Sequence, residues 1–147
     1  MLDRDAILDA FRRLAELLRE RGVEGEVCLL GGTVMVLAFR SRPATKDVDA
    51  IFQPASLAGD LPQFEGLRLT TPTPEYMLAM KCMASRIGAG PGDPGDVGDI
   101  AYLIDHLGLR SATDALGIVT RYYPENLVPP KAVYLLEDLF AARERRP

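Results

Sequence analysis

The first twenty residues show the periodicity of an amphipathic helix. Apolar side chains recur three and four positions apart, with charged side chains between them. Asp3 precedes the segment as an N-cap, and Gly22 follows it as a stop signal. The expected apolar face consists of Ile7, Leu8, Phe11, Leu14, Leu17 and Leu18. The pattern therefore predicts a helix between Asp3 and Gly22.

Two apolar segments on either side of a glycine pair predict a strand followed by a buried helix. Residues 26–30 form a short apolar run that ends at Gly31-Gly32, and residues 33–39 continue apolar without alternation. A strand, a glycine turn and a buried helix explain this order. Residues 47–52 then predict a second strand, which carries charged side chains.

From residue 67 onward the pattern changes to helices. Residues 67–71 predict a weak third strand, and Thr73-Pro74 has the form of an N-cap followed by proline at the first position of a helix that reaches Ile87. The glycine- and proline-rich residues 88–95 predict a mobile loop beside a site or a short hinge. Further helices are predicted over 97–107, after the cap Ser111, and after Pro129-Pro130.

These elements predict a mixed α/β (α+β) fold. A small mixed β-sheet with flanking helices occupies residues 1–72, and residues 73–147 are helical. The chain has 147 residues, of which 48% are hydrophobic, so it is long enough to form a single domain with a substantial core. The two parts are therefore expected to form one domain over residues 1–147.

Charge and cysteine usage restrict the classes of function. The formal net charge is −4, which argues against a globally basic nucleic-acid-binding protein but does not exclude a local basic patch. Cys28 and Cys82 are too few for a disulfide scaffold, and each lies in an apolar run. No uninterrupted apolar segment suits secretion or membrane insertion. We expect a cytoplasmic protein without a membrane partner.

Two aspartates on the second predicted strand indicate a metal site. Asp47 and Asp49 are two residues apart, so in a regular strand they point to the same face, opposite Val48, Ala50 and Phe52. Neighbouring carboxylates repel each other unless a cation compensates their charge. Hard oxygen ligands of this kind suit Mg²⁺ or Mn²⁺, which predicts that these residues bind such an ion.

The glycine pair predicts a phosphate-binding turn near these acids. Gly31 and Gly32 allow the backbone to approach a ligand closely, and the predicted helix behind them presents free N–H groups. Thr33 adds a hydroxyl donor, while Arg42 and Lys46 can neutralise phosphate oxygens. We therefore expect these five residues to bind a phosphate group.

The order of these motifs resembles the DNA polymerase β-like nucleotidyltransferase superfamily. The resemblance consists of Gly31-Gly32, a short helix, and then Thr45-Lys-Asp-Val-Asp49. Among its branches, the chain is most similar to small AbiEii toxin-like and related uncharacterised nucleotidyltransferase domains, and the similarity covers about residues 25–105. The usual Gly-Ser turn is Gly-Gly here. The resemblance implies the nucleotidyltransferase fold.

A second stretch extends the resemblance into the helical half. AbiEii-like proteins complete their site with a lysine and an arginine on one helix and a following Asp-x-x-Asp, which match Lys81, Arg86, Asp96 and Asp99. The resemblance implies that Asp47, Asp49 and Lys81 are catalytic, with Lys81 steadying the triphosphate, and that Asp96 and Asp99 are additional acids. It also implies that the nucleotide is bound by Gly31, Gly32, Thr33, Arg42, Lys46 and Arg86. From the residues alone, other roles stay open: Lys81 can pair with either aspartate, Asp96 can cap its helix, and Asp99 can be solvated.

The implied activity is Mg²⁺-dependent transfer of a nucleoside monophosphate from a nucleoside triphosphate to an RNA, protein or small-molecule acceptor. The resemblance also suggests the toxin of a toxin–antitoxin pair, with an antitoxin protein as partner. However, the superfamily often has a third carboxylate on the next strand, and residues 67–71 contain none. The alternative is a catalytically impaired nucleotide-binding or partner-binding module of the same fold.

Overall fold

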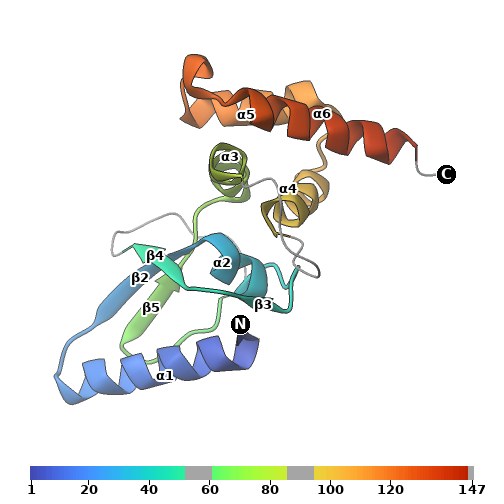
Figure 1. Ribbon diagram of the computed structural model, residues 1–147. Coiled ribbons are helices and arrows are strands. Elements are labelled where there is room, and N and C mark those ends of the chain that lie inside the picture. Colours follow the sequence, from blue (N-terminus) through green and yellow to red (C-terminus); the bar gives the residue numbers. More distant parts are fainter. Residues whose placement is uncertain (52–60, 86–94, 146–147) are drawn as a thin grey trace. The chain divides into compact units, whose positions relative to one another are not determined.

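The computed structural model describes residues 1–51, 61–85 and 95–145 (Figure 1). Within these residues it contains six α-helices, one short 3-10 helix, a two-stranded sheet and a three-stranded sheet. This confirms the predicted mixed α/β class. The chain divides into two compact units, Met1–Thr73 and Pro74–Pro147, which we call the sheet unit and the helical unit.

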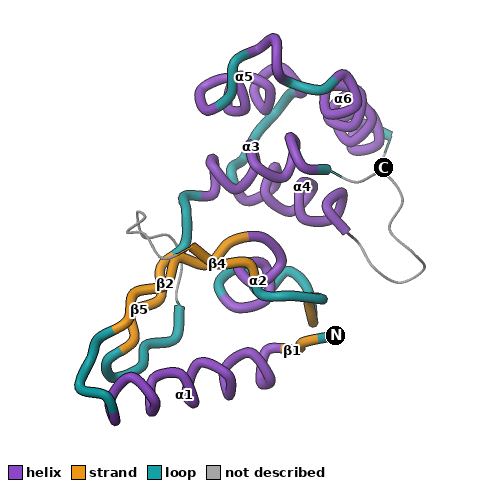
Figure 2. Tube along the Cα trace, turned by 60° about the vertical axis from the view of Figure 1, so that its left-hand side comes forward, coloured by secondary structure: helices purple, strands orange, loops and turns teal. Residues whose placement is uncertain are grey.

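The larger sheet of the sheet unit has the order β4-β2-β5 (Figure 2). The central strand β2 (Gly25–Leu30) pairs antiparallel with β4 (Asp49–Ile51) and parallel with β5 (Leu67–Thr70). In this register Leu30 opposes Asp49, and Cys28 opposes Thr70. The strands predicted from the sequence are present, but β4 begins two residues later than expected.

A second, two-stranded sheet was not predicted. β1 (Leu2–Asp3) pairs antiparallel with β3 (Ala44–Thr45), so that Leu2 opposes Thr45 and Asp3 opposes Ala44. Each strand has only two residues, which is too short for an alternating pattern to be recognised. This sheet joins the beginning of the chain to the segment that leads into the two aspartates.

Helix α1 (Arg4–Glu20) covers one face of the three-stranded sheet (Figure 1). The Asp3 side chain caps it, as predicted, by accepting a hydrogen bond of 2.9 Å from the Ala6 backbone N–H. Leu17 was expected on the buried face but is 52% exposed. Ala15 is buried instead, because it continues the stripe formed by Ile7 and Phe11 at intervals of four residues.

The apolar run after the glycine pair forms the predicted buried helix, α2 (Gly31–Leu37). Every residue from Gly32 to Leu37 in this helix is buried, which explains why the sequence shows no polar face there. Gly31 has a backbone φ of +58°, a left-handed conformation that favours glycine at the junction of β2 and α2.

The helical unit is built around α3, which packs against α4 and α5, while α6 packs against α5 (Figure 2). The predicted cap Ser111 is confirmed, since it accepts a hydrogen bond of 3.1 Å from the Asp114 N–H, and Pro130 is the first residue of α6. The elements are α3 (Pro74–Ala84), α4 (Gly95–His106), α5 (Ala112–Tyr122), the 3-10 helix η1 (Glu125–Leu127) and α6 (Pro130–Glu144). Of the loop predicted over 88–95, only Gly95 belongs to the described residues, and it begins α4.

The structure also shows the state of the two cysteines and the character of the helices. Cys28 and Cys82 are both buried free thiols, and burial raises the pKa of Cys82 to about 12, so this thiol stays protonated at neutral pH. Among the helices of the described residues, none combines the length and the apolar character needed to cross a membrane.

Thr70 carries a buried hydroxyl that is unpaired among the described residues, and this leads to a stability prediction. We expect Thr70→Val to raise the free energy of unfolding by about 1 kcal/mol, because it removes an unsatisfied polar group at nearly constant shape. Urea unfolding measures the change. Thr33→Val is the control, because the Thr33 hydroxyl donates to the Asp47 carbonyl and its loss should destabilise the protein. A destabilised Thr70→Val variant would contradict the prediction.

Candidate functional site

The structure brings Asp49 and the glycine pair together. Asp49 is the first residue of β4 and opposes Leu30, which directly precedes Gly31. A Cβ atom on Gly31 would lie only 2.6 Å from the Asp49 Oδ2 atom, so the exposed carboxylate is against the backbone of this glycine. We call this arrangement the glycine corner: Gly31 and Gly32 together with the side chains that contact them.

Gly32 is contacted by a hydroxyl and a guanidinium group. A Cβ atom at Gly32 would overlap the Thr45 hydroxyl oxygen and would lie 3.6 Å from Arg42 Nη1. The Arg42 Nε atom donates a hydrogen bond of 3.0 Å to the Ala44 carbonyl, which fixes the direction of the guanidinium group. One glycine therefore faces an anionic group and the next faces two hydrogen-bond donors.

Thr33 and Asp47 are linked, although not in the way that the sequence suggested. The Thr33 hydroxyl donates to the Asp47 backbone carbonyl at 3.3 Å, and Thr33 is completely buried. Thr33 was expected to offer this hydroxyl to a phosphate group. In the structure the hydroxyl instead ties α2 to the segment that leads into β4.

The second aspartate lies just before the strand that was expected to contain it. Because β4 begins at Asp49, strand alternation does not determine the direction of the Asp47 side chain. Asp47 and Lys46 are both exposed. Val48, which was expected on an apolar face, is 39% exposed, since this residue precedes the paired part of the strand. Asp47 thus lies near the corner through its backbone contact with Thr33.

The charges around the corner suit a phosphate group together with a cation. Asp47 and Asp49 supply carboxylates, and Arg42 and Lys46 supply positive charge from the same short segment. Mg²⁺ is commonly bound by one or two carboxylates together with phosphate oxygens and water, so two aspartates fit an ion that arrives with a polyphosphate. Over residues 1–51, 61–85 and 95–145, no three His, Cys, Asp or Glu side chains form a group suited to a metal ion.

Lys81 forms a buried cluster with two aspartates inside the helical unit. Its Nζ atom lies 2.9 Å from Asp96 Oδ1 and 2.8 Å from Asp99 Oδ2, which joins α3 to α4. Lys81 is 8% exposed and Asp99 is 2% exposed. Burial lowers the pKa of Lys81, but the hydrogen bonds and negative charges of Asp99 and Asp96 outweigh it and raise the pKa above its ordinary value.

The cluster shows the contacts of three residues whose structural roles the sequence left open. Lys81 pairs with both aspartates, and Asp99 is buried rather than solvated. Asp96 lies in the first turn of α4, which begins at Gly95, and so it does not precede the helix as a cap. Arg86 lies outside the described residues. The three clustered residues belong to the helical unit, whereas the glycine corner belongs to the sheet unit.

Thr45 is a residue of the glycine corner that was not predicted from the sequence. Its side chain contacts Gly32 because β3 pairs with β1, with Thr45 opposite Leu2. Leu2 and Thr45 are 43 positions apart in the sequence, so no local pattern indicates that their strands pair. The only available signal was a hydroxyl-bearing residue inside the Thr45-Lys-Asp-Val-Asp49 motif.

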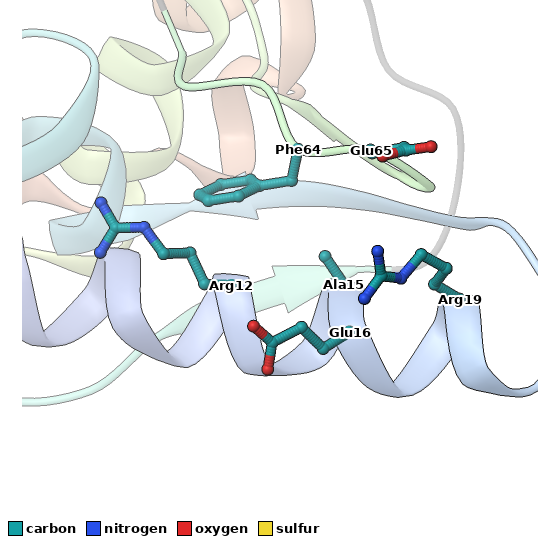
Figure 3. Close-up of a pocket in the computed structure, with 6 residues that line it drawn as sticks. All are labelled: Arg12, Ala15, Glu16, Arg19, Phe64 and Glu65. Carbon is teal, nitrogen blue, oxygen red and sulfur yellow. The ribbon is translucent and has the colours of Figure 1, made fainter.

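A groove of about 210 Å³ lies along α1, and none of the predicted site residues is among the residues that line it (Figure 3). Its two arginines and two glutamates balance in charge, and Phe64, which also contacts Phe11 at a ring distance of 6.4 Å, forms its apolar part. The lining residues are Arg12, Ala15, Glu16, Arg19, Phe64 and Glu65. Nothing in this set of side chains indicates a catalytic centre.

Comparisons of the chain with models of protein families, with curated proteins and with solved structures found no match. The choice of a function therefore depends on the residues and their geometry.

Proposed function

We propose that this protein is a nucleotidyltransferase that depends on Mg²⁺ or Mn²⁺ and transfers a nucleoside monophosphate from a nucleoside triphosphate to an acceptor. The observation that carries the proposal is the glycine corner, where the Asp49 carboxylate contacts Gly31 and the Arg42 guanidinium group lies beside Gly32. This arrangement agrees with the resemblance of the motifs to the DNA polymerase β-like superfamily. The candidate acceptors are RNA, protein or a small molecule.

In this proposal each residue of the sheet unit has a distinct task. Arg42 and Lys46 neutralise the polyphosphate, and Gly32 lets it approach the backbone closely. Asp49 and Asp47 are the ligands of the divalent cation, which neutralises charge on the phosphate oxygens when bound. Phosphoryl-transfer sites work mainly by positioning and charge neutralisation, so the chemistry does not require a histidine or cysteine.

The proposed reaction is an in-line displacement at the α-phosphorus of the nucleotide. An acceptor oxygen forms a bond to this phosphorus atom, its proton passes to solvent, and the bond between the α-phosphorus and the α–β bridging oxygen breaks. Pyrophosphate leaves with that oxygen. The chain contributes by holding the triphosphate in one direction and by compensating the charge on the leaving group with Arg42.

A second candidate is a nucleotide-binding or partner-binding module without turnover. The composition of β5 favours this second candidate. β5 pairs with β2 and carries Arg68 and Thr70, whereas the superfamily often has a carboxylate on this strand. Residues 67–70 therefore add no third carboxylate to Asp47 and Asp49. In this candidate, the corner binds the nucleotide, while the third ligand needed for transfer is missing.

Transfer of radiolabel tests the proposal directly. Purified protein is incubated with each of the four α-labelled nucleoside triphosphates, Mg²⁺ or Mn²⁺, and total RNA. We expect label to appear on RNA, on the protein or on a small molecule, and we expect excess EDTA to abolish it, because the carboxylates act through the cation. Tight binding of a nucleotide without transfer would favour the second candidate. If the protein shows no binding of any nucleotide and no transfer, both candidates are refuted. Co-purification with a small partner protein would support the toxin–antitoxin role.

A further inference from the structure

Two hydroxyl groups near the glycine corner differ in what they contact. Thr33 and Thr45 are both buried, but the Thr33 hydroxyl donates to the Asp47 carbonyl and so serves the fold. The Thr45 hydroxyl lies against Gly32, in the space that any side chain at this position would fill. Of these two threonines, Thr45 is therefore the one whose hydroxyl borders the glycine that a phosphate group would approach.

Thr45 and Arg42 are anchored by the same small sheet. Thr45 opposes Leu2 in the β1–β3 pair, and Ala44, whose carbonyl accepts the hydrogen bond from Arg42 Nε, opposes Asp3. Both side chains also contact the same side of Gly32. The hydroxyl and the guanidinium group are thus fixed near each other before any ligand binds, which reduces the entropy that binding would cost.

We propose that Thr45 is a further phosphate-binding residue, whose hydroxyl donates with the Arg42 guanidinium group to one phosphate of the polyphosphate chain at Gly32. The inference rests on the proposed function and deepens it, because it assigns the hydroxyl donor of the corner to Thr45 instead of Thr33. A hydroxyl and a guanidinium group are typical donors to phosphate oxygens, and hydrogen bonds to charged acceptors are stronger than neutral ones. The hydroxyl occupies the space that a side chain at position 32 would fill, so glycine at this position allows Thr45 to lie directly against the backbone.

Serine and alanine at position 45 provide a matched pair that differs only in the hydroxyl group. Inorganic tripolyphosphate with Mg²⁺ is titrated into the full chain by isothermal titration calorimetry. We expect Thr45→Ser to bind within about threefold of the wild-type affinity and Thr45→Ala to bind about tenfold more weakly, because a hydrogen bond to a charged oxygen is lost. Thr45→Val serves as a second variant without the hydroxyl if Thr45→Ala does not fold.

The same pair of substitutions at Thr70, a buried threonine on β5, is the control, and we expect no difference in affinity between Thr70→Ser and Thr70→Ala. Equal affinity of Thr45→Ala and Thr45→Ser would overturn the inference, and so would a wild-type protein that does not bind tripolyphosphate. Hydroxyl-dependent binding of tripolyphosphate without any transfer of nucleotide would support the role of Thr45 while it refutes the proposed transferase activity. Failure of the inference about Thr45 can therefore be distinguished from failure of the proposed transferase activity.

Discussion

Replacing Lys81 with methionine is expected to lower the free energy of unfolding by about 3–5 kcal/mol. Methionine keeps most of the side-chain volume but removes a positive charge that lies 2.8 Å from the carboxylate of Asp99, which is only 2% exposed. Without the Lys81 charge, this buried carboxylate must either remain charged in a poorly solvated environment or take up a proton, and both states destabilise α3 against α4. Urea unfolding followed by circular dichroism measures the loss.

An exposed ion pair provides the comparison for this prediction. Asp9 and Arg12 pair on α1 with both side chains more than half exposed, so Asp9→Ala should change stability by roughly 0.5 kcal/mol or less. In the helical unit, adding Asp99→Asn to Lys81→Met should recover part of the lost stability, because the double variant leaves no buried negative charge at position 99. A loss below about 1 kcal/mol for Lys81→Met would show that solvent compensates Asp99.

The same variant separates two roles for Lys81. A folded Lys81→Met protein with low stability and normal transfer would assign the lysine to the packing of α3 and α4. A folded protein with normal stability and no transfer would assign it to the triphosphate, as the resemblance implies. The observed distances of 2.8 and 2.9 Å to two carboxylates favour the first result.

Elements with local signals were predictable from the sequence. Asp3, Ser111 and Pro130 mark helix starts because capping depends on residues within one turn. The strand β2 was predictable because its apolar run ends at a glycine pair. In contrast, β1 and β3 consist of two residues each and exist only through their mutual pairing, which local periodicity does not reveal.

The candidate site was likewise predictable only where local signals determine it. The proximity of Asp49 to Gly31 follows from the pairing of β2 with β4, which is the next strand of the same sheet along the chain, and such neighbours commonly pair. The contact between Thr45 and Gly32 depends on the β1–β3 sheet and therefore required the structure. The partners of Lys81 were left open because Asp96 and Asp99 lie on a different helix, and periodicity does not determine how two helices pack.

Asp49→Asn is expected to reduce the rate of nucleotide transfer by at least about 100-fold while it leaves the fold intact. The substitution keeps the shape of the side chain beside Gly31 but removes a negative charge that is expected to bind the cation. Because the Asp49 side chain is exposed, the change should have little effect on the free energy of unfolding. Initial rates of label transfer at saturating Mg²⁺ measure the effect.

The control for Asp49→Asn is Glu26→Gln, which removes an exposed carboxylate at the opposite end of the neighbouring strand β2. This variant should transfer label at the wild-type rate. Asp47→Asn should have a smaller effect than Asp49→Asn, because Asp47 lies outside the paired strand and is held near the corner through its backbone. Transfer at the wild-type rate by Asp49→Asn would exclude the carboxylate as a ligand of the catalytic cation. In that case the contact with Gly31 would only shape the turn between β2 and α2.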